Sequence, residues 1–276
     1  MPPIALAPPP VEEGKHILTL KDIVALPYAV REEWVRRYLP PRLLRQFSID
    51  RETFLNPQGE KVVEHSGAPL SGEIKIVVWR SLRDRDPVAL AEAADTSTDQ
   101  IELRFLMTND PDAPRFDVDV DPAGHSTLLG TAGRNLAAEV AAMEAGLAPG
   151  QVRRGLGLVL KDILPRFEAF LTEIGHDLVL AVPLAYHNAI LMEHWGFDYL
   201  YGRRLMEDID RRFRRGGDRR ARLDGSTPFR QPALAGTVRG RSWAIHDGIL
   251  GEPLEPMKMV KRVGHHARVK TCKGPY

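Results

Sequence analysis

The spacing of apolar residues changes along the chain, and this change limits what the chain can fold into. Residues 73–80 (EIKIVVWR) and 100–107 (QIELRFLM) alternate or run apolar, as β-strands do. From residue 131 the apolar residues recur every three or four positions, which is typical of helices. A short apolar run at 177–182 then precedes a helical stretch and a second strand-like stretch that ends at residue 201. This order predicts an α+β (mixed α/β) domain, with a central mixed sheet flanked by helices.

Proline residues and local alternation predict further elements. Residues 20–47 should form two helices with a break at Pro40-Pro41, because proline cannot continue a helix interior. Residues 115–121 (RFDVDVD) alternate strictly and predict a third strand with one polar face. A short helix or loop is expected at 86–94. A helix should run from Pro149-Gly150 to about residue 175.

The distribution of proline and glycine favours one domain with an extension at each end. Residues 1–15 are rich in proline and predict a disordered or draped arm. Residues 16–215 carry the periodic apolar patterns and should form the α/β domain. Residues 216–276 are rich in glycine, proline and turn pairs, which predicts a loop-rich extension packed on that domain.

Composition excludes several classes of protein. Of 276 residues, 43% are apolar, enough for one large or two small cores, and no apolar run approaches the roughly 18–20 residues of a membrane span. Lys plus Arg (38) nearly balances Asp plus Glu (37), so overall charge points to neither nucleic acid nor a membrane. The single cysteine, Cys272, excludes an internal disulfide. We expect a soluble, cytoplasmic protein that acts on a small molecule; a homodimer is left open.

Two arginines and two glycines stand at the start of a predicted helix. The stretch APGQVRRGLG places Arg153 and Arg154 just before Gly155 and Gly157. Unpaired backbone N–H groups at a helix N-terminus attract phosphate, and glycine lets a ligand approach the backbone closely. The alternative interpretation is that the glycines permit close helix packing while the arginines are solvated.

The order of elements over 73–202 resembles the GNAT acyltransferase superfamily. In that family a Gly-x-Gly loop before the central helix binds the pyrophosphate of an acyl-coenzyme A, and a strand, a helix and a Gly-Phe pair follow, as in AILMEHWGFDYLYG here. The resemblance implies an N-acyltransferase that moves an acyl group from acyl-CoA, its co-substrate, to an amine of a small molecule, with no metal. It implies that the arginine–glycine loop binds the coenzyme. Asn188 would contact the pantetheine arm or, alternatively, cap a helix.

The chain departs from the family pattern in its chemistry-bearing positions. Val152 stands where the family has Gln or Arg, and Met192 stands where many members have a tyrosine that protonates the thiolate. Residues 135–146 look helical where the family has a strand leading into the loop, and the helix from Ala185 is about one residue short. The missing tyrosine implies another proton donor, water, or lost activity.

Three side chains are candidate general bases. His187 and Glu193 lie on one predicted helix, and His246 lies in the extension. Histidine suits this role because its reference pKa, about 6.5, is close to working pH. The alternative for each is an ordinary capping or exposed side chain.

The same part of the extension supplies candidate substrate-binding residues. Arg239 and Arg241 could hold a carboxylate or phosphate through their planar guanidinium groups, with Asp247 beside His246 as its neighbour. Alternatively, these arginines pair with acidic residues while nearby aromatics pin the extension.

Two other functions remain open from the residues. A metal-dependent enzyme could use Asp117, Asp119 or His125 with His187 or His246, because alternation aligns the carboxylates on one face; a solvated strand face is the alternative. A non-catalytic protein could sense acyl-CoA or bind an acidic partner through the arginine-rich helix expected over 203–215. We do not expect nucleic acid as a partner, because no known nucleic-acid motif accompanies the basic stretches.

Overall fold

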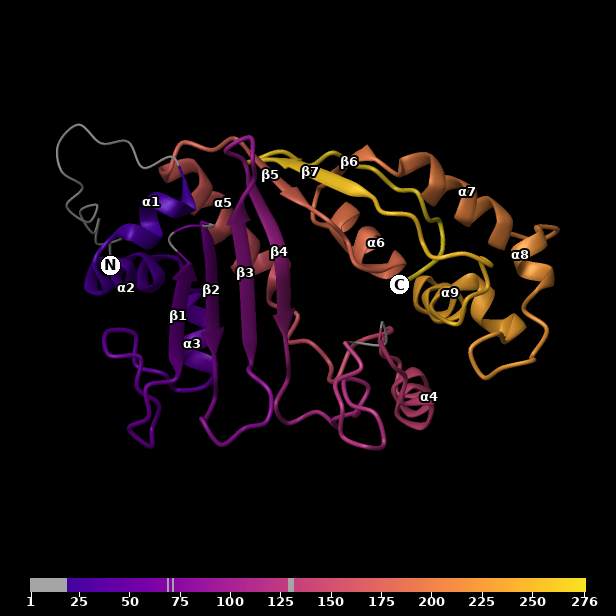
Figure 1. The fold of residues 1–276 in the computed structure, drawn as a ribbon, viewed down its shortest axis with the longest axis horizontal. Coiled ribbons are helices and arrows are strands. Elements are labelled where there is room, and N and C mark those ends of the chain that lie inside the picture. Colours follow the sequence, from indigo (N-terminus) through magenta and orange to yellow (C-terminus); the bar gives the residue numbers. More distant parts are fainter. Residues whose placement is uncertain (1–18, 69, 71, 129–131) are drawn as a thin grey trace. The chain divides into compact units, whose positions relative to one another are not determined.

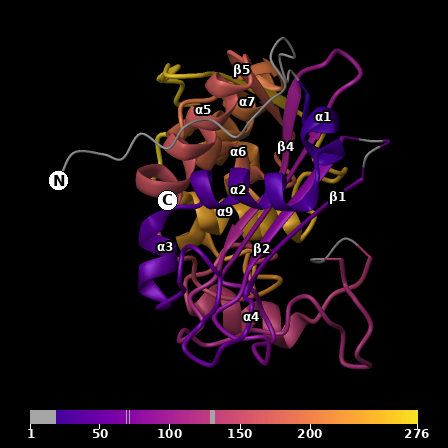
Figure 2. The ribbon, with the colours of Figure 1, turned by 90° about the vertical axis from the view of Figure 1, so that its left-hand side faces the viewer.

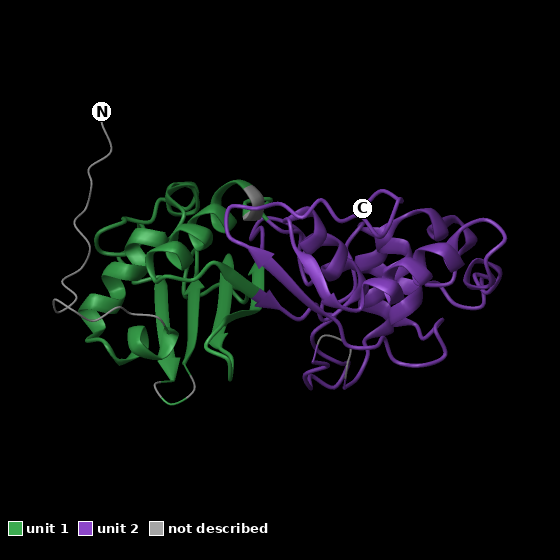
Figure 3. Cartoon of the chain, turned by 90° about the horizontal axis from the view of Figure 1, so that it is seen from above, with its two compact units in different colours: residues 1–108, 156–179 green, residues 109–155, 180–276 purple. Residues whose placement is uncertain are grey.

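The computed structural model describes residues 19–68, 70, 72–128 and 132–276. The chain has a mixed α/β fold with a seven-stranded mixed sheet in the order β1-β2-β3-β4-β5-β7-β6, flanked by helices (Figure 1), so the predicted fold class is confirmed. The chain forms two compact units (Figure 3). Unit 1 contains the described residues up to 108 together with 156–179, and unit 2 contains 109–155 and 180–276. The expected arm at 1–15 lies outside the described residues.

Unit 1 is built on four antiparallel strands. These are β1 (Val63–Ala68), β2 (Glu73–Val78), β3 (Ala89–Asp95) and β4 (Ile101–Thr108). A shift in register at Glu92/Ala93 marks a β-bulge between β3 and β4. Both strands expected at 73–80 and 100–107 are therefore confirmed.

Strand β3 replaces the short helix or loop that was expected at 86–94. Its sequence, ALAEAAD, is rich in alanine, which favours helix in isolation. However, β3 pairs with β2 along one edge and with β4 along the other, and these two ladders outweigh the local preference of the residues.

The helices of unit 1 begin and end where proline and capping residues dictate. They are α1 (Leu20–Ala25), α2 (Tyr28–Tyr38), α3 (Pro41–Gln46) and α5 (Leu164–Glu173), the last preceded by a π-helical turn, η1 (Val159–Ile163). Thr19 caps α1 by accepting a hydrogen bond from the backbone N–H of Asp22 at 3.1 Å. The expected break at Pro40-Pro41 is confirmed, and Pro27 adds a second one. Figure 2 shows α1, α2 and α3 in front of the sheet.

Unit 2 contains most of the remaining elements. These are α4 (Leu136–Glu144), α6 (Tyr186–His194), β6 (Asp198–Tyr201), α7 (Arg203–Phe213), α8 (Asp218–Ala221), the 3-10 helix η2 (Pro232–Gly236), α9 (Val238–His246) and β7 (Lys258–Arg262). Strand β5 (Leu178–Ala181) contains the boundary between the units. The elements expected over 135–146 and 177–213 are confirmed, and Asn135 caps α4 through the N–H of Ala138.

The helix expected from Pro149-Gly150 begins only at Val159, and two further predictions for unit 2 are wrong. Residues 115–121 do not form a strand: a single β-bridge joins Val120 to Ser126, and Arg115 instead pairs with Asp117 and Asp119. Alternation alone could not make a strand here, because no neighbouring strand among the described residues satisfies the backbone groups. The extension after residue 216 is also more regular than its glycine and proline content predicts, since it supplies α9 and β7.

The centre of unit 2 is formed by α9 and the segments around it. Trp243 stacks on Phe229, with ring centroids 5.2 Å apart, and its Nε1–H donates to the carbonyl oxygen of Leu147 at 2.8 Å. Both rings pack with buried Val118, Ala142 and other apolar side chains. The aromatics of the extension are therefore anchors, as one reading of the sequence proposed.

Candidate functional site

The predicted coenzyme loop has an open glycine at its end. Gly157 is exposed with φ of +67°, and a Cβ added there would meet no atom within 4 Å. The helical segment η1–α5 begins two residues later, at Val159. Within the described part of the chain, neither the backbone N–H of Gly157 nor that of Leu158 donates a hydrogen bond. Two free donors thus precede a 15-residue helical segment (159–173).

The two arginines of the loop differ in their surroundings. Arg153 is half-buried, and its Nη1 donates to the carbonyl oxygens of Pro111 and Ala113, so this guanidinium pins the loop. Arg154 is exposed, which leaves its charge available to an anion. Gly155 is the last residue of its segment in unit 2, and Leu156 donates its backbone N–H to Thr108 Oγ1 at 3.1 Å in unit 1.

Asn188 does not cap a helix. It is the third residue of α6, whose N-cap position is Ala185 and has no side-chain hydrogen bond. The Oδ1 atom of Asn188 is buried without a hydrogen-bond partner among the described residues. The capping interpretation is therefore wrong, and the coenzyme contact stays a prediction.

His187 is enclosed in unit 2 between α6 and α9. Its side chain is 4% exposed, and its Nδ1 lies 2.8 Å from the hydroxyl oxygen of buried Ser242. Burial lowers the pKa of His187 to about 3, with further lowering by the nearby charges of His246 and Arg239. The imidazole is therefore neutral at neutral pH, and it is a far weaker base than an ordinary histidine.

Glu193 is a structural carboxylate. It is 2% exposed and accepts hydrogen bonds from the Tyr199 hydroxyl at 2.7 Å, the Thr271 backbone N–H at 3.0 Å and the Thr271 hydroxyl. These three bonds tie α6 to β6 and to the segment after β7. Both oxygens of this buried carboxylate are occupied by hydrogen-bond donors, so the general-base assignment of Glu193 finds no support in this geometry.

His246 belongs to a chain of charged side chains, which we call the ionic chain: Arg134, Glu139, His246, Asp247 and Arg230. His246 Nε2 lies 3.4 Å from Glu139 Oε1, and Arg134 reaches both Glu139 and Asp247. Arg230 Nε donates to Asp247 Oδ2 at 2.9 Å. Burial alone would raise the pKa of Glu139, but hydrogen bonds from His246 and Arg134 outweigh burial and lower it.

Within the ionic chain, His246 and Asp247 differ in their exposure and in the number of hydrogen bonds that they make. The His246 side chain remains 18% exposed and makes one long polar contact, so it is the most accessible of the three candidate bases. Asp247 accepts from Arg134, Arg230 and the Thr227 hydroxyl. These donors occupy both carboxylate oxygens of Asp247, which argues against the predicted substrate contact.

Arg239 and Arg241 also differ from each other in their surroundings. Arg241 is buried and donates to Asp210 Oδ1 at 2.6 Å and to the carbonyl oxygen of Ala235 at 2.7 Å, so it is a core residue and not a substrate ligand. The guanidinium of Arg239 lies over the Tyr276 ring, 4.8 Å from its centroid. Its buried Nε has no hydrogen-bond partner within the described residues, which keeps Arg239 as a candidate ligand for an anion.

The acidic stretch at 117–125 is neutralised by its own neighbours. Arg115 binds Asp117 and Asp119, and His125 Nδ1 lies 3.3 Å from Asp121 Oδ2. Across the described ranges, no three His, Cys, Asp or Glu side chains gather in a way that could hold a metal ion. The metal-dependent alternative therefore has no geometric support.

Sequence reasoning missed Glu139 and Ser242, which hold the two histidines. Glu139 sits in an alanine-rich helix where a surface role is the ordinary expectation, and Ser242 is a small polar residue between Arg241 and Trp243. Neither position carries a local signal, because the partners lie 107 and 55 residues away.

The comparisons with known proteins add nothing to these assignments, which therefore rest on the geometry of the site. None of the helices in the described part of the chain combines the length and apolar character that a membrane-spanning segment needs. No family model, no curated protein and no solved structure matches the chain.

Proposed function

We propose that the chain binds an acyl-coenzyme A and transfers its acyl group to an amine of a small molecule. The observation that carries this proposal is the open turn at Gly157, whose backbone N–H donates no hydrogen bond among the described residues, directly before buried Leu158 and the helical segment 159–173. Such a turn favours a diphosphate, because the amides donate hydrogen bonds and the helix dipole favours negative charge. Arg154, exposed beside it in sequence, adds a cation.

The transfer step needs a base for the amine and a proton for the leaving thiolate. The amine nitrogen attacks the thioester carbonyl carbon, the carbon–sulfur bond breaks, and the thiolate leaves and takes a proton. Among the three candidate bases, which all belong to unit 2, His246 is the most suitable, since it is more accessible than His187 and less fully bonded than Glu193. Its contact with Glu139 would stabilise the imidazolium that forms when it accepts the proton.

A second candidate function is acyl-CoA binding without turnover. The specific observation in its favour is that two of three candidate bases, His187 and Glu193, are enclosed and hydrogen-bonded. Met192 also stands where the resemblance places a proton-donating tyrosine. A protein with this site could report the presence of acyl-CoA to a partner.

Thermal stabilisation by coenzyme A tests the binding step. A ligand present at about 100 times its Kd should raise the free energy of unfolding by about 2.7 kcal/mol. Gly157→Val should abolish this gain, because its side chain strains the positive φ and fills the space in front of the amides. Gly59→Val is the matched control in unit 1, since Gly59 also has a positive φ (+77°) and open surroundings.

The two variants separate loss of the site from loss of stability. Both valines should lower the melting temperature of the free protein, but only Gly157→Val should remove the response to the coenzyme. An equal response in Gly157→Val and the wild type would refute the phosphate turn. Release of free thiol from acetyl-CoA with an amine panel then separates transferase from non-catalytic binder, and His246→Gln should abolish that release without changing coenzyme binding.

A further inference from the structure

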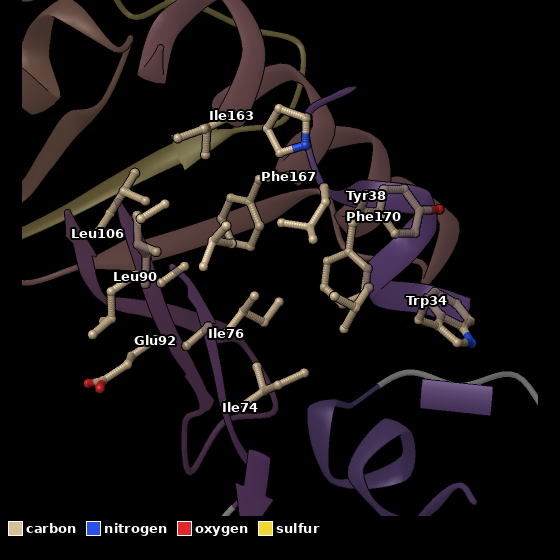
Figure 4. Close-up of a pocket in the computed structure, with 18 of the residues that line it drawn as sticks. Trp34, Tyr38, Ile74, Ile76, Leu90, Glu92, Leu106, Ile163, Phe167 and Phe170 are labelled. Carbon is tan, nitrogen blue, oxygen red and sulfur yellow. The ribbon is translucent and has the colours of Figure 1, made fainter. Parts of the chain in front are cut away.

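Unit 1 contains an apolar cavity that the proposed transfer does not use. It has a volume of about 150 Å³ and lies between the sheet face of β2, β3 and β4 and the helices that cover it. Figure 4 shows Phe167 and Phe170 facing Ile76 across this space, with Ile163 and Leu106 at its other end. Cores of this size are ordinarily packed without voids larger than a water molecule, so the space is a feature to be explained.

The floor of the cavity is a row of alanines. Ala89, Ala91 and Ala93 of β3 alternate on one face, and each is paired across β2 with a larger side chain. Those partners are Val78, Ile76 and Ile74. On the other side, Ala91 pairs with Leu106 of β4. On this face, β3 therefore carries small side chains between the larger side chains of β2 and β4, which leaves a trough along β3.

Aromatic side chains close the trough from above. Phe170 meets Trp34 and Tyr38 edge to face, at centroid distances of 5.8 and 5.3 Å, and it lies 6.3 Å from Phe167. In Figure 4 the Tyr38 hydroxyl, the Trp34 nitrogen and the Glu92 carboxylate all point away from the space. The interior is therefore apolar and matches a hydrocarbon rather than a polar ligand.

One cation on the wall has no ion-pair partner among the described residues. Arg31 of α2 is half-buried and lines the cavity, and its buried Nε has no hydrogen-bond partner in the part of the chain that the structure describes. Its guanidinium lies 5.8 Å from the centroid of the Tyr28 ring, and among residues that the structure describes it forms no ion pair. The acidic residue next to it, Glu32, is already bound by Lys61 and Arg36. A buried donor without an acceptor favours an anionic ligand group at this place.

We propose that this cavity binds an unbranched aliphatic carboxylate, with its chain on the alanine row and its carboxylate at Arg31. An engineered apolar cavity of roughly 150 Å³ holds one benzene, so about six carbons fit inside. A chain of six to eight carbons would therefore fill the space and leave its head group near the wall. This site is independent of coenzyme binding, and its test uses no coenzyme.

Titration calorimetry with octanoate tests the site directly. Octanoate should bind, and between butanoate and octanoate each added methylene should tighten binding about fourfold while it enters the cavity. Ala91→Leu fills the trough and should weaken octanoate at least tenfold. Arg104→Leu is the matched control, because it adds the same side chain on the neighbouring strand, at an exposed position outside the cavity.

Two further variants test the cavity independently of how well Ala91→Leu folds. Ile76→Ala enlarges the cavity and should shift the preferred ligand from octanoate toward decanoate. Arg31→Gln should weaken octanoate while leaving 1-octanol unchanged, since the alcohol has no charge for Arg31 to bind. Wild-type protein that binds no octanoate, or an Ala91→Leu variant that binds it unchanged, would overturn the proposal.

A parallel titration distinguishes two sources of the same chain. If Ala91→Leu weakens octanoyl-CoA tenfold but leaves coenzyme A itself unchanged, the cavity also accepts the chain of a thioester. If octanoyl-CoA binding is unchanged in Ala91→Leu while octanoate binding is lost, the free acid is the ligand. Coenzyme binding that fails in every variant would count against the proposed transfer and leave the octanoate result as it stands.

Discussion

The interiors of the two units differ in the kind of side chain that they bury. Within the described residues of unit 1, Asn56 is the one polar side chain in the buried class, and the helices and sheet meet through apolar contacts around a cavity. Unit 2 buries charged and titratable side chains in its interior: Glu139, His187, Glu193, Asp210, Arg219, Arg241 and Lys261. Unit 1 tolerates one incompletely packed space. The stability of unit 2, in contrast, depends on each buried charge keeping its hydrogen-bond or ion-pair partner.

This difference explains why the candidate residues of unit 2 are so fully engaged. A buried charge without a partner costs several kcal/mol, so evolution of a charged interior requires a hydrogen bond for nearly every group. Glu193 and Asp210 each have two or more donors. In unit 1, Arg31 lines a mostly apolar cavity and its buried Nε has no hydrogen-bond partner among the described residues, which is why it points to a ligand.

The largest effect should follow from breaking a buried pair in unit 2. Arg241→Met leaves Asp210 enclosed with the exposed Arg214 as its remaining partner, and should lower the free energy of unfolding by about 3–5 kcal/mol in urea. Arg203→Met, which breaks an exposed pair with Glu207, should cost at most about 0.5 kcal/mol. The double change Asp210→Leu/Arg241→Met should recover most of the loss. Equal effects of the two single variants would contradict the buried-charge account.

A smaller effect should appear in the dependence of the free energy of unfolding on pH. The pKa of His187 falls from about 6.5 in the unfolded chain to about 3 in the folded one. Between these values the unfolded state binds a proton that the folded state does not, so stability is present above pH 6.5 and falls as pH decreases. The slope should be about 1.4 kcal/mol per pH unit, and His187→Asn should remove it.

His65 of unit 1 provides the comparison for this titration. Burial also lowers its pKa, with Arg31 contributing, but the side chain is only half-buried. His65→Asn should therefore change the slope less than His187→Asn does. Urea unfolding between pH 5 and 7 measures both, and a larger change in the His65 variant would contradict the assignment of the main titration to unit 2.

The same substitution should have opposite signs in the two units. Ala91→Leu fills the cavity of unit 1 and should raise stability by about 0.5–2 kcal/mol. Ala244→Leu places the same side chain in α9, at a fully buried position of unit 2, and should lower stability by about 1–3 kcal/mol. Thermal unfolding measures both, and destabilisation by Ala91→Leu would show that the trough is already filled.

The sequence predicted the fold wherever pattern and propensity agreed. Residues 203–213 are helical in the structure as expected, because Met206, Ile209 and Phe213 recur at helical spacing. Strand β3 and helix α9 were missed for opposite reasons: β3 has helix-forming alanines that pairing overrides, and α9 has a glycine and turn-like flanks that burial overrides.

The candidate site was predictable only in part. Gly157 could be found, since a glycine before a helix carries a local physical meaning. The roles of Glu193 and Arg241 could not, because their partners Thr271 and Asp210 are 78 and 31 residues away. The cavity could not be predicted from the sequence either. Its floor depends on the register of β2, β3 and β4, and the sequence of one strand does not show that the side chains paired with it are larger.

The proposed contact with the diphosphate of a coenzyme is the open turn at Gly157, with buried Leu158 as the next residue. Amide NMR measures this contact at the atoms concerned. On addition of coenzyme A, the N–H signals of Gly157 and Leu158 should shift with a saturable dependence on concentration, while the signal of Gly59 stays in place. Unchanged Gly157 and Leu158 signals at a saturating coenzyme concentration would contradict the claim.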